Sequence, residues 1–94
     1  MLVLSLLKRR PYYGYELVQK ISKTIEISEG TIYPLLRRLR KDNMVSTYLE
    51  ESEEGAPRKY YKLTALGEDT LSDSLKEWNS FYEDVNNLLD KGNE

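Results

Sequence analysis

Apolar positions in the first 43 residues recur at the spacing of an α-helix, in three separate runs. The first run covers residues 2–8 and predicts a short helix that ends before Pro11, because proline disfavours helical backbone in the residue ahead of it. The second predicts a helix over residues 14–24. The third predicts a helix that begins at Ser28, whose hydroxyl can cap the first turn, and stops near Asn43. Its expected buried face consists of Ile32, Leu35, Leu36 and Leu39.

The period then changes to two, which is the side-chain spacing of a β-strand. Residues 44–50 and 59–63 predict the two strands of a hairpin. The polar segment 51–57 between them contains glycine and proline and predicts a loop. A last, long helix is expected over residues 65–90, with Thr64 as its cap.

Three short helices followed by a hairpin are the element order of a winged helix-turn-helix. The expected fold class is mainly α with a small β-hairpin, and it ends in one long helix. We expect a winged helix-turn-helix DNA-binding domain over residues 1–64 and a C-terminal dimerisation helix over residues 65–94.

The composition removes most classes of enzyme. The 94 residues contain no cysteine and no histidine, which excludes disulfides, thiolate or imidazole metal sites, and catalysis through either side chain. Carboxylates and tyrosines are the remaining acid–base candidates, and no phosphate-binding loop or metal constellation organises them. We therefore expect no enzymatic activity, no catalytic residues, no metal and no cofactor.

The sequence also predicts a cytoplasmic location. Its apolar runs are too short to span a membrane, and residues 2–7 lack the flanking segments of a secretory signal. We therefore expect no membrane partner.

Charge divides the chain in two, although the whole chain has a net charge of only −2. Residues 1–64 contain twelve Lys/Arg and eight Asp/Glu, a net +4. Residues 65–94 contain two and eight, a net −6. Such asymmetry suggests a surface that faces a polyanion, joined to an element that stays away from it.

The third predicted helix offers an exposed face that suits DNA. At 100° per residue, small residues lie opposite Ile32 near the N-terminal end, and cations lie farther along the same face. A helix in a major groove needs this grading, because its first turns approach the bases closely and its later turns meet backbone phosphates. The candidate DNA-binding residues on this helix are Ser28, Gly30, Thr31, Tyr33, Pro34, Arg37, Arg38 and Lys41. The alternative interpretation of the cations is an ordinary solvated face.

The hairpin supplies two further candidate DNA-binding residues, Arg58 and Lys59, placed to reach an adjacent minor groove. Four acidic residues of the neighbouring loop are expected to point away from any DNA, namely Glu50, Glu51, Glu53 and Glu54. Their pattern is typical of a solvated loop. A calcium site would need alternating oxygen ligands and a defined turn.

At these residues the chain resembles the PadR family of transcriptional regulators, in particular its small members with a single C-terminal helix. The resemblance runs from about residue 4 to residue 89. It rests on five motifs in order: Pro11-Tyr-Tyr-Gly14-Tyr-Glu-Leu17, Ser28-Glu-Gly-Thr-Ile-Tyr-Pro34-Leu-Leu-Arg-Arg-Leu39, Arg58-Lys-Tyr-Tyr-Lys-Leu-Thr64, Gly67 and Trp78. It implies a homodimer that binds double-stranded DNA, usually as a repressor that a small molecule relieves.

Carried over by position, the resemblance places Thr31 and Tyr33 in the recognition segment and Arg58 and Lys59 in the wing. Two features depart from the family's pattern. Ala56 follows the wing glycine where relatives often carry a basic residue, which weakens the expected wing contact. The first helix is also shorter at its N-terminus than in relatives, so we expect either a trimmed start or the loss of part of the dimer contact.

The last predicted helix carries an apolar seam with heptad-like spacing. The seam consists of Leu71, Leu75, Trp78, Tyr82, Val85 and Leu89, with Phe81 and Leu88 beside it. A helix of about 26 residues is roughly 39 Å long, longer than the diameter of a domain built from the remaining residues. A second chain is therefore expected to cover much of the seam, and such a dimer predicts a pseudo-palindromic operator.

Trp78 lies in the middle of the seam and has two interpretations. It either packs in the dimer interface or binds a ligand. The resemblance implies the second role, because small members of the family place paired tryptophans around an apolar pore that takes flat aromatic compounds. The candidate effector-binding residues are Trp78, Phe81 and Tyr82. The alternative function for the whole chain is a winged-helix module that docks on a protein without binding DNA.

Overall fold

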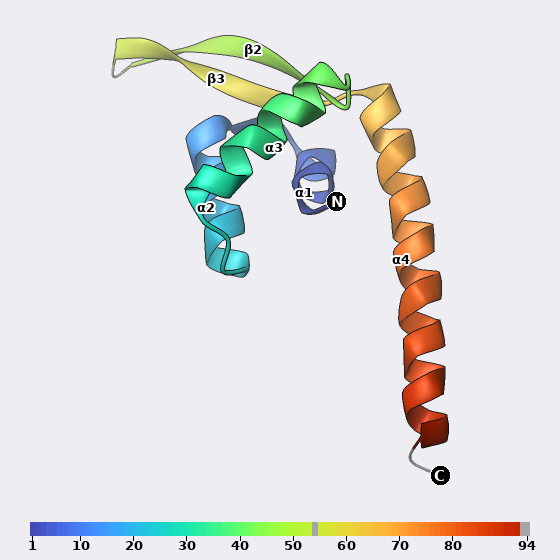
Figure 1. Cartoon of the computed structure of the whole chain (residues 1–94). Helices are drawn as coiled ribbons and strands as arrows, with labels where there is room; N and C mark the ends of the chain where they lie inside the picture. Colours follow the sequence, from blue (N-terminus) through green and yellow to red (C-terminus); the bar gives the residue numbers. More distant parts are fainter. Residues whose placement is uncertain (54, 93–94) are drawn as a thin grey trace.

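The computed structural model describes residues 1–53 and 55–92, and Figure 1 shows their arrangement. The elements in chain order are α1 (Leu2–Arg9), β1 (Tyr12–Tyr13), α2 (Gly14–Thr24), α3 (Glu29–Lys41), β2 (Val45–Ser52), β3 (Gly55–Leu63) and α4 (Ala65–Gly92). The predicted fold class is confirmed: three helices and a hairpin form a winged helix-turn-helix, and one long helix follows it. The strand β1 was not predicted from the sequence.

Local sequence signals set the end of α1 and the start of α4, as predicted. The backbone of Arg10 is extended, with φ −170° and ψ 165°, ahead of Pro11. The hydroxyl oxygen of Thr64 accepts a hydrogen bond from the backbone N–H of Gly67 at 2.9 Å. The same hydroxyl donates to the carbonyl oxygen of Asn43 at 2.6 Å, so the cap of α4 is tied to the end of α3.

The start of α3 differs in one detail from the prediction. Ser28 occupies the cap position, but its hydroxyl bonds to the hydroxyl of Thr31 at 3.0 Å and makes no hydrogen bond to a backbone amide of the first turn. The predicted cap bond is wrong because a second hydroxyl lies within reach one turn later. The predicted stop is confirmed, since α3 ends before Asn43, whose φ of 60° is left-handed.

The sheet has three antiparallel strands in the order β1-β3-β2, and the sequence predicted only two. Tyr12 pairs with Tyr61, and Tyr13 pairs with Tyr60. Two residues are too few to show a period, so the sequence pattern could not predict β1. The strand forms because it pairs with β3, far along the chain.

The hairpin is also longer than predicted. β2 runs to Ser52 and β3 begins at Gly55, where φ is +125°. Most of the predicted loop 51–57 therefore belongs to strands. This part of the hairpin extends beyond the helices (Figure 1), so its residues pair through their backbones and need no apolar side chain facing a core.

The core lies where α1, α2, α3 and the inner face of the sheet meet, and the start of α4 closes it. The buried apolar side chains are Val3, Leu4, Leu7, Tyr12, Leu17, Val18, Ile21, Ile32, Leu36, Val45, Tyr61 and Leu71. Gly67 allows α4 to approach this closely. A Cβ at that position would lie 2.7 Å from the side chain of Leu63 and would overlap the carbonyl of Met44.

Two apolar residues lie in different places from those predicted. Leu35, expected on the buried face of α3, is 45% exposed and borders an open apolar hollow with Leu2 and Ile27. Leu71, expected in the dimer seam, is 1% exposed and packs in the core of its own chain. Leu71 therefore has no surface to offer a partner, because the first two turns of α4 complete the core.

The rest of α4 projects away from the other elements (Figure 1). The principal extents of the molecule are 62 × 27 × 21 Å, and the radius of gyration is 16.6 Å. A compact domain of this length has a radius of gyration of about 12 Å. In the part of the chain that the structure describes, no helix combines the length and the apolar character needed to cross a membrane.

Candidate nucleic-acid interface

The exposed face of α3 carries the residues predicted to bind DNA. Ile32 and Leu36 are buried on its opposite face. The exposed residues are Ser28 at the cap and Gly30, Thr31, Tyr33, Pro34, Arg37, Arg38 and Lys41 on the helix. The helix therefore presents small residues near its N-terminus and cations toward its C-terminus.

The first turn of α3 is held against α2 through its one acidic residue. The side-chain amide of Gln19 donates a hydrogen bond to the carboxylate of Glu29 at 2.6 Å. This bond directs the carboxylate toward α2. The backbone N–H groups of a helix N-terminus are natural donors to a phosphate, and here they stand beside the small residue Gly30.

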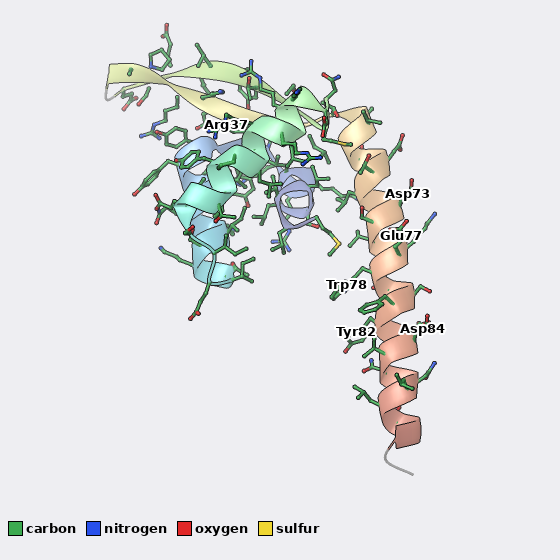
Figure 2. The ribbon with its side chains drawn as sticks, in the orientation of Figure 1. Arg37, Asp73, Glu77, Trp78, Tyr82 and Asp84 are labelled. Atoms are coloured by element: carbon green, nitrogen blue, oxygen red, sulfur yellow. The ribbon has the colours of Figure 1, made fainter. Side chains whose placement is uncertain are left out.

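The cations of α3 are in open solvent. Arg38 lies 3.8 Å from Asp42 in an i,i+4 pair, and the two side chains are 81% and 50% exposed. Such a pair contributes little stability, so a DNA phosphate can replace Asp42 at small cost. Figure 2 shows Arg37 on the stretch of α3 that lies beneath the hairpin.

The two wing cations lie on opposite faces of the hairpin. Arg58 is directly across from Glu50, and Lys59 is directly across from Leu49. The ammonium of Lys59 is 5.6 Å from the ring centre of Tyr61 on the inner face. From the sequence we expected the two cations to form one contact with DNA and Glu50 to point away from DNA. Because side chains alternate between the two faces of a strand, Glu50 and Arg58 instead lie on the same face.

Tyr33 stands out among the side chains of α3 because its environment is only partly aqueous. Partial burial is the main cause that raises the pKa of the Tyr33 phenol, and the Glu29 carboxylate raises it further. The nearby phenols of Tyr13, Tyr61 and Tyr15 act in the same direction. Tyr33 is therefore a neutral hydrogen-bond donor at and above neutral pH.

Sequence reasoning missed a group of tyrosines between the wing and α2. Tyr48 of β2, Tyr60 of β3 and Tyr13 of β1 are directly paired across the sheet, and Tyr15 follows in the first turn of α2. Their grouping depends on the unpredicted strand β1. A signal was present in the composition, since eight tyrosines against one phenylalanine indicate that the hydroxyl matters.

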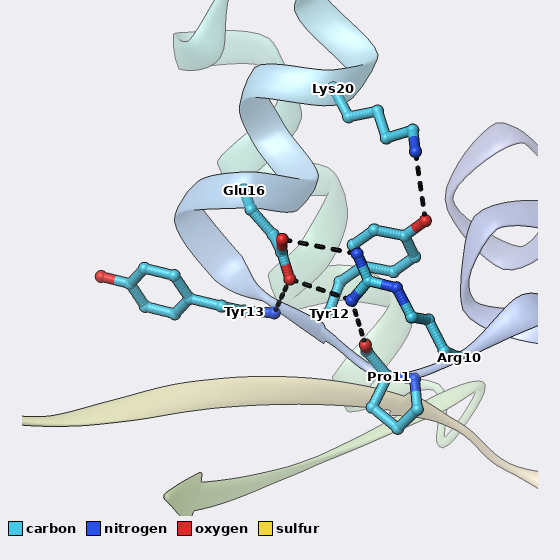
Figure 3. Close-up of polar contacts among 6 residues, drawn as sticks. All are labelled: Arg10, Pro11, Tyr12, Tyr13, Glu16 and Lys20. Atoms are coloured by element: carbon cyan, nitrogen blue, oxygen red, sulfur yellow. Dashed lines mark hydrogen bonds and ion pairs between the residues drawn. The ribbon is translucent and has the colours of Figure 1, made fainter. Parts of the chain in front are cut away.

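A polar cluster fixes the junction of β1 and α2 (Figure 3). The guanidinium of Arg10 lies 3.2 Å from the Glu16 carboxylate and 3.8 Å from the centre of the Tyr12 ring, and it donates to the carbonyl of Pro11 at 3.0 Å. Glu16 also accepts the backbone N–H of Tyr13 at 3.1 Å. The hydrogen bond from Arg10 is the main cause that lowers the pKa of Glu16.

The apolar seam of α4 is largely exposed beyond the core. Leu75 is half-buried against the core, and Val85 is also half-buried. The exposed side chains in and beside the seam are Trp78 at 49%, Tyr82 at 57%, Leu89 at 59%, Phe81 at 61% and Leu88 at 71%. Figure 2 shows Trp78 and Tyr82 on the side of α4 turned toward the rest of the chain, and Asp73 and Asp84 on the opposite side.

An exposed basic helix within a helix-turn-helix, flanked by a hairpin wing, defines a winged-helix DNA-binding protein. The chain belongs to the transcriptional regulator PadR-like family, whose model matches residues 3–73. It is accordingly a DNA-binding transcriptional regulator, from a family of regulators rather than of enzymes.

Solved structures agree with this assignment, and one curated protein is similar in sequence. A PadR-like transcriptional regulator from Bacillus cereus is 38% identical, with a TM-score of 0.83 over 93% of this chain and 86% of that chain. A PadR family transcription regulator from Clostridium difficile is 34% identical, with a TM-score of 0.84 over 94% of each chain. An uncharacterised protein from Lysinibacillus sphaericus is 37% identical over 82% of this chain and 74% of its own length.

Proposed function

We propose that the chain acts in the cytoplasm as a homodimeric repressor that binds a pseudo-palindromic operator and is relieved by a small aromatic or hydrophobic effector. One observation carries the proposal. An uncovered apolar seam runs along the projecting part of α4, which is joined to a winged helix with an exposed basic α3. Residues 1–64 form the DNA-binding part, and residues 65–94 form the dimerisation part.

The dimer forms through Leu75, Trp78, Tyr82, Val85 and Leu89, the seam residues that retain exposed surface. Five neighbouring side chains of Trp, Tyr, Phe and Leu type, each about half exposed or more, form an apolar surface that water disfavours. The acidic side of α4 stays in solvent. Two copies packed through the seam exclude water from it and place two winged helices in one assembly.

Each copy contacts DNA through α3 and the wing. The N-terminal residues of α3 from Ser28 to Pro34 approach the bases, while Arg37, Arg38 and Lys41 meet phosphates. Arg58 and Lys59 contact the backbone near the adjacent minor groove. Because the dimer has a two-fold axis, the operator has two half-sites about one helical turn apart.

The effector binds between the two copies of Trp78. The rings of Trp78 and Phe81 are 6.2 Å apart and tilted by 42°, and both are exposed beside Tyr82. A ligand releases DNA only if it binds the non-DNA conformation better, and a coupling of about 1–3 kcal/mol changes DNA affinity roughly 5- to 150-fold. By the same linkage, operator DNA weakens ligand binding.

Sedimentation and DNA binding test the proposal together. The wild-type chain of 11.0 kDa should sediment as a dimer of about 22 kDa, and its DNA affinity should fall steeply as salt rises. Trp78→Ala should abolish the effect of planar aromatic compounds on operator affinity and leave dimerisation and DNA binding largely intact. A monomer at micromolar concentration, or a protein partner bound without salt dependence, would contradict the proposal and favour a docking module.

A further inference from the structure

Four tyrosines form a continuous row from the wing into α2. The register pairs Tyr48 with Tyr60 and Tyr60 with Tyr13, so the three stand side by side on β2, β3 and β1. Their successive ring centres are 5.5 Å and 6.1 Å apart. Tyr15 extends the row, with its ring 6.4 Å from that of Tyr13. These four residues are called the tyrosine row.

The tyrosine row is not part of the core. Tyr12 and Tyr61 are the inward-facing members of the same strands and are only 3% and 7% exposed. By contrast, Tyr48 and Tyr15, at the two ends of the row, are 41% and 57% exposed. Figure 3 shows the ring of Tyr13 pointing away from that of Tyr12, with its hydroxyl at the far end.

The hydroxyls of the row are free to bind something outside the chain. Within residues 1–53 and 55–92, the one hydrogen bond to a tyrosine hydroxyl runs from the Lys20 ammonium to Tyr12. The row therefore presents unpaired phenol donors. Because its rings pack on one another, those donors lose little side-chain freedom when they bind a ligand.

The tyrosine row has neighbours in both elements proposed to contact DNA. The guanidinium carbon of Arg58, in the hairpin, lies 5.1 Å from the centre of the Tyr13 ring. Tyr33 of α3 is near enough to Tyr13 and Tyr15 for their phenols to interact electrostatically. Tyr13 and Tyr15 thus lie near α3, whereas Tyr48 and Tyr60 lie on the outer face of the hairpin with Arg58 and Glu50.

We infer that Tyr13 and Tyr15, the members of the tyrosine row near α3, contact the DNA backbone, with their phenol hydroxyls donating hydrogen bonds to phosphate oxygens. This inference rests on the proposed DNA-binding function. Contacts of this kind fix the register and orientation of a protein on the duplex and carry no sequence information. A neutral phenol releases no counterion, so the row adds affinity without adding to the salt dependence.

Single-stranded nucleic acid is a less suitable ligand for the row. Base stacking needs open ring faces, whereas Tyr48 and Tyr60 already stack on each other with an interplanar angle of 14°. The groups available to bind a ligand are therefore the hydroxyls at the edges of the rings, and not the ring faces. Replacing tyrosine with phenylalanine removes that edge and keeps the ring, and therefore separates the two modes of binding.

The test measures binding of the full chain to a mixed-sequence duplex of about 30 base pairs, long enough for two half-sites one helical turn apart. Tyr13→Phe and Tyr15→Phe should each lower affinity by about tenfold, since a hydrogen bond to a charged group is lost. Their salt slopes should equal that of the wild type. Arg58→Ala should instead reduce the slope. Tyr12→Phe, on the inner face of the same strand, is the matched control and should bind as the wild type does.

The outcomes separate this inference from the proposed function. If the wild type shows salt-dependent binding and both phenylalanine variants bind equally well, the inference is overturned and the proposed function stands. If Tyr13→Leu weakens binding but Tyr13→Phe does not, the aromatic ring contributes to DNA binding and the hydroxyl contact is refuted. A wild-type chain that does not bind the duplex would overturn the proposed function and the role of the row together. Circular dichroism of each variant confirms that it is folded.

Discussion

Residues 1–64 and the projecting part of α4 bury their apolar side chains in opposite ways. In the first region, Ile32 and Leu36 of α3 face a core built from the same chain and are nearly inaccessible. In the second, the apolar positions continue past Leu75 to Trp78 and Leu89, and no element among residues 1–53 and 55–92 covers them. The core of the first region is therefore completed within the chain, with Leu71 from the start of α4, whereas the apolar side of the second region is exposed and has the pattern of an interface.

The two regions also differ in charge, which indicates how they are arranged on DNA. Residues 1–64 have a net charge of +4, and residues 65–94 have a net charge of −6. On α4 the acidic residues labelled in Figure 2, such as Asp73 and Asp84, lie opposite Trp78 and Tyr82. An acidic helix beside DNA would be repelled, so we expect the basic region to face the duplex and α4 to lie away from it.

The largest expected effect comes from Leu71, the seam position of α4 that is fully buried in the core. Leu71→Ala should lower the free energy of unfolding by about 2–5 kcal/mol, because it leaves a cavity in the core. Urea denaturation measures this loss. A loss no larger than that of a surface substitution would show that the start of α4 is not part of the core.

A seam residue farther along α4 should separate dimerisation from folding. Leu89→Asp would bury an unpaired charge in the dimer, which costs several kcal/mol and weakens association by at least about 100-fold. Sedimentation should then report 11.0 kDa, with circular dichroism close to that of the wild type. Ser80→Asp adds the same charge at an exposed position and should leave the dimer intact. If both variants remain dimers, the seam is not the dimer interface.

A change in α3 should affect DNA binding and leave the dimer unchanged. Arg37→Ala removes one phosphate contact per chain and should weaken binding to all sequences alike. It should also reduce the magnitude of the salt slope by about one unit per contacting chain. Fluorescence anisotropy across a salt series measures both quantities. A loss confined to one base position would instead identify Arg37 as a base contact.

The smallest effect should come from the cluster between β1 and α2. The pKa of Glu16 is lowered in the folded chain, chiefly by the hydrogen bond from Arg10, so its stabilising contribution is present above the ordinary glutamate pKa of about 4.3. That contribution is lost as pH falls through the lowered pKa. Because the side chain is 41% exposed, Glu16→Gln should lower stability at pH 7 by less than about 1 kcal/mol. Urea titrations should show the difference between wild type and variant disappear at acidic pH.

Elements set by local signals could be predicted from the sequence. The limits of α1 and the start of α4 follow from Pro11 and Thr64, and the exposed face of α3 follows from the helical period around Ile32. Each of these depends on residues within one or two turns of the feature. The predicted DNA-binding residues of α3 are exposed for the same reason.

Features set by distant residues could not be predicted in the same way. β1 exists because Tyr12 pairs with Tyr61, and this pairing also assembles the tyrosine row. Leu71 has the spacing of a seam residue, and only the packing of α4 on the other elements shows that it belongs to the core. Leu35 has the spacing of a core residue but borders an open hollow. Periodicity reports which side of an element is apolar, and it does not report what covers that side.

The number of chains bound per DNA duplex tests most directly whether the two regions act together. Native mass measurement of the complex with an operator-length duplex should find two wild-type chains per duplex. The folded monomer Leu89→Asp should bind the same duplex far more weakly, because one basic region alone makes half of the contacts. One chain per duplex for the wild type, or equally tight binding by the folded monomer, would contradict the account.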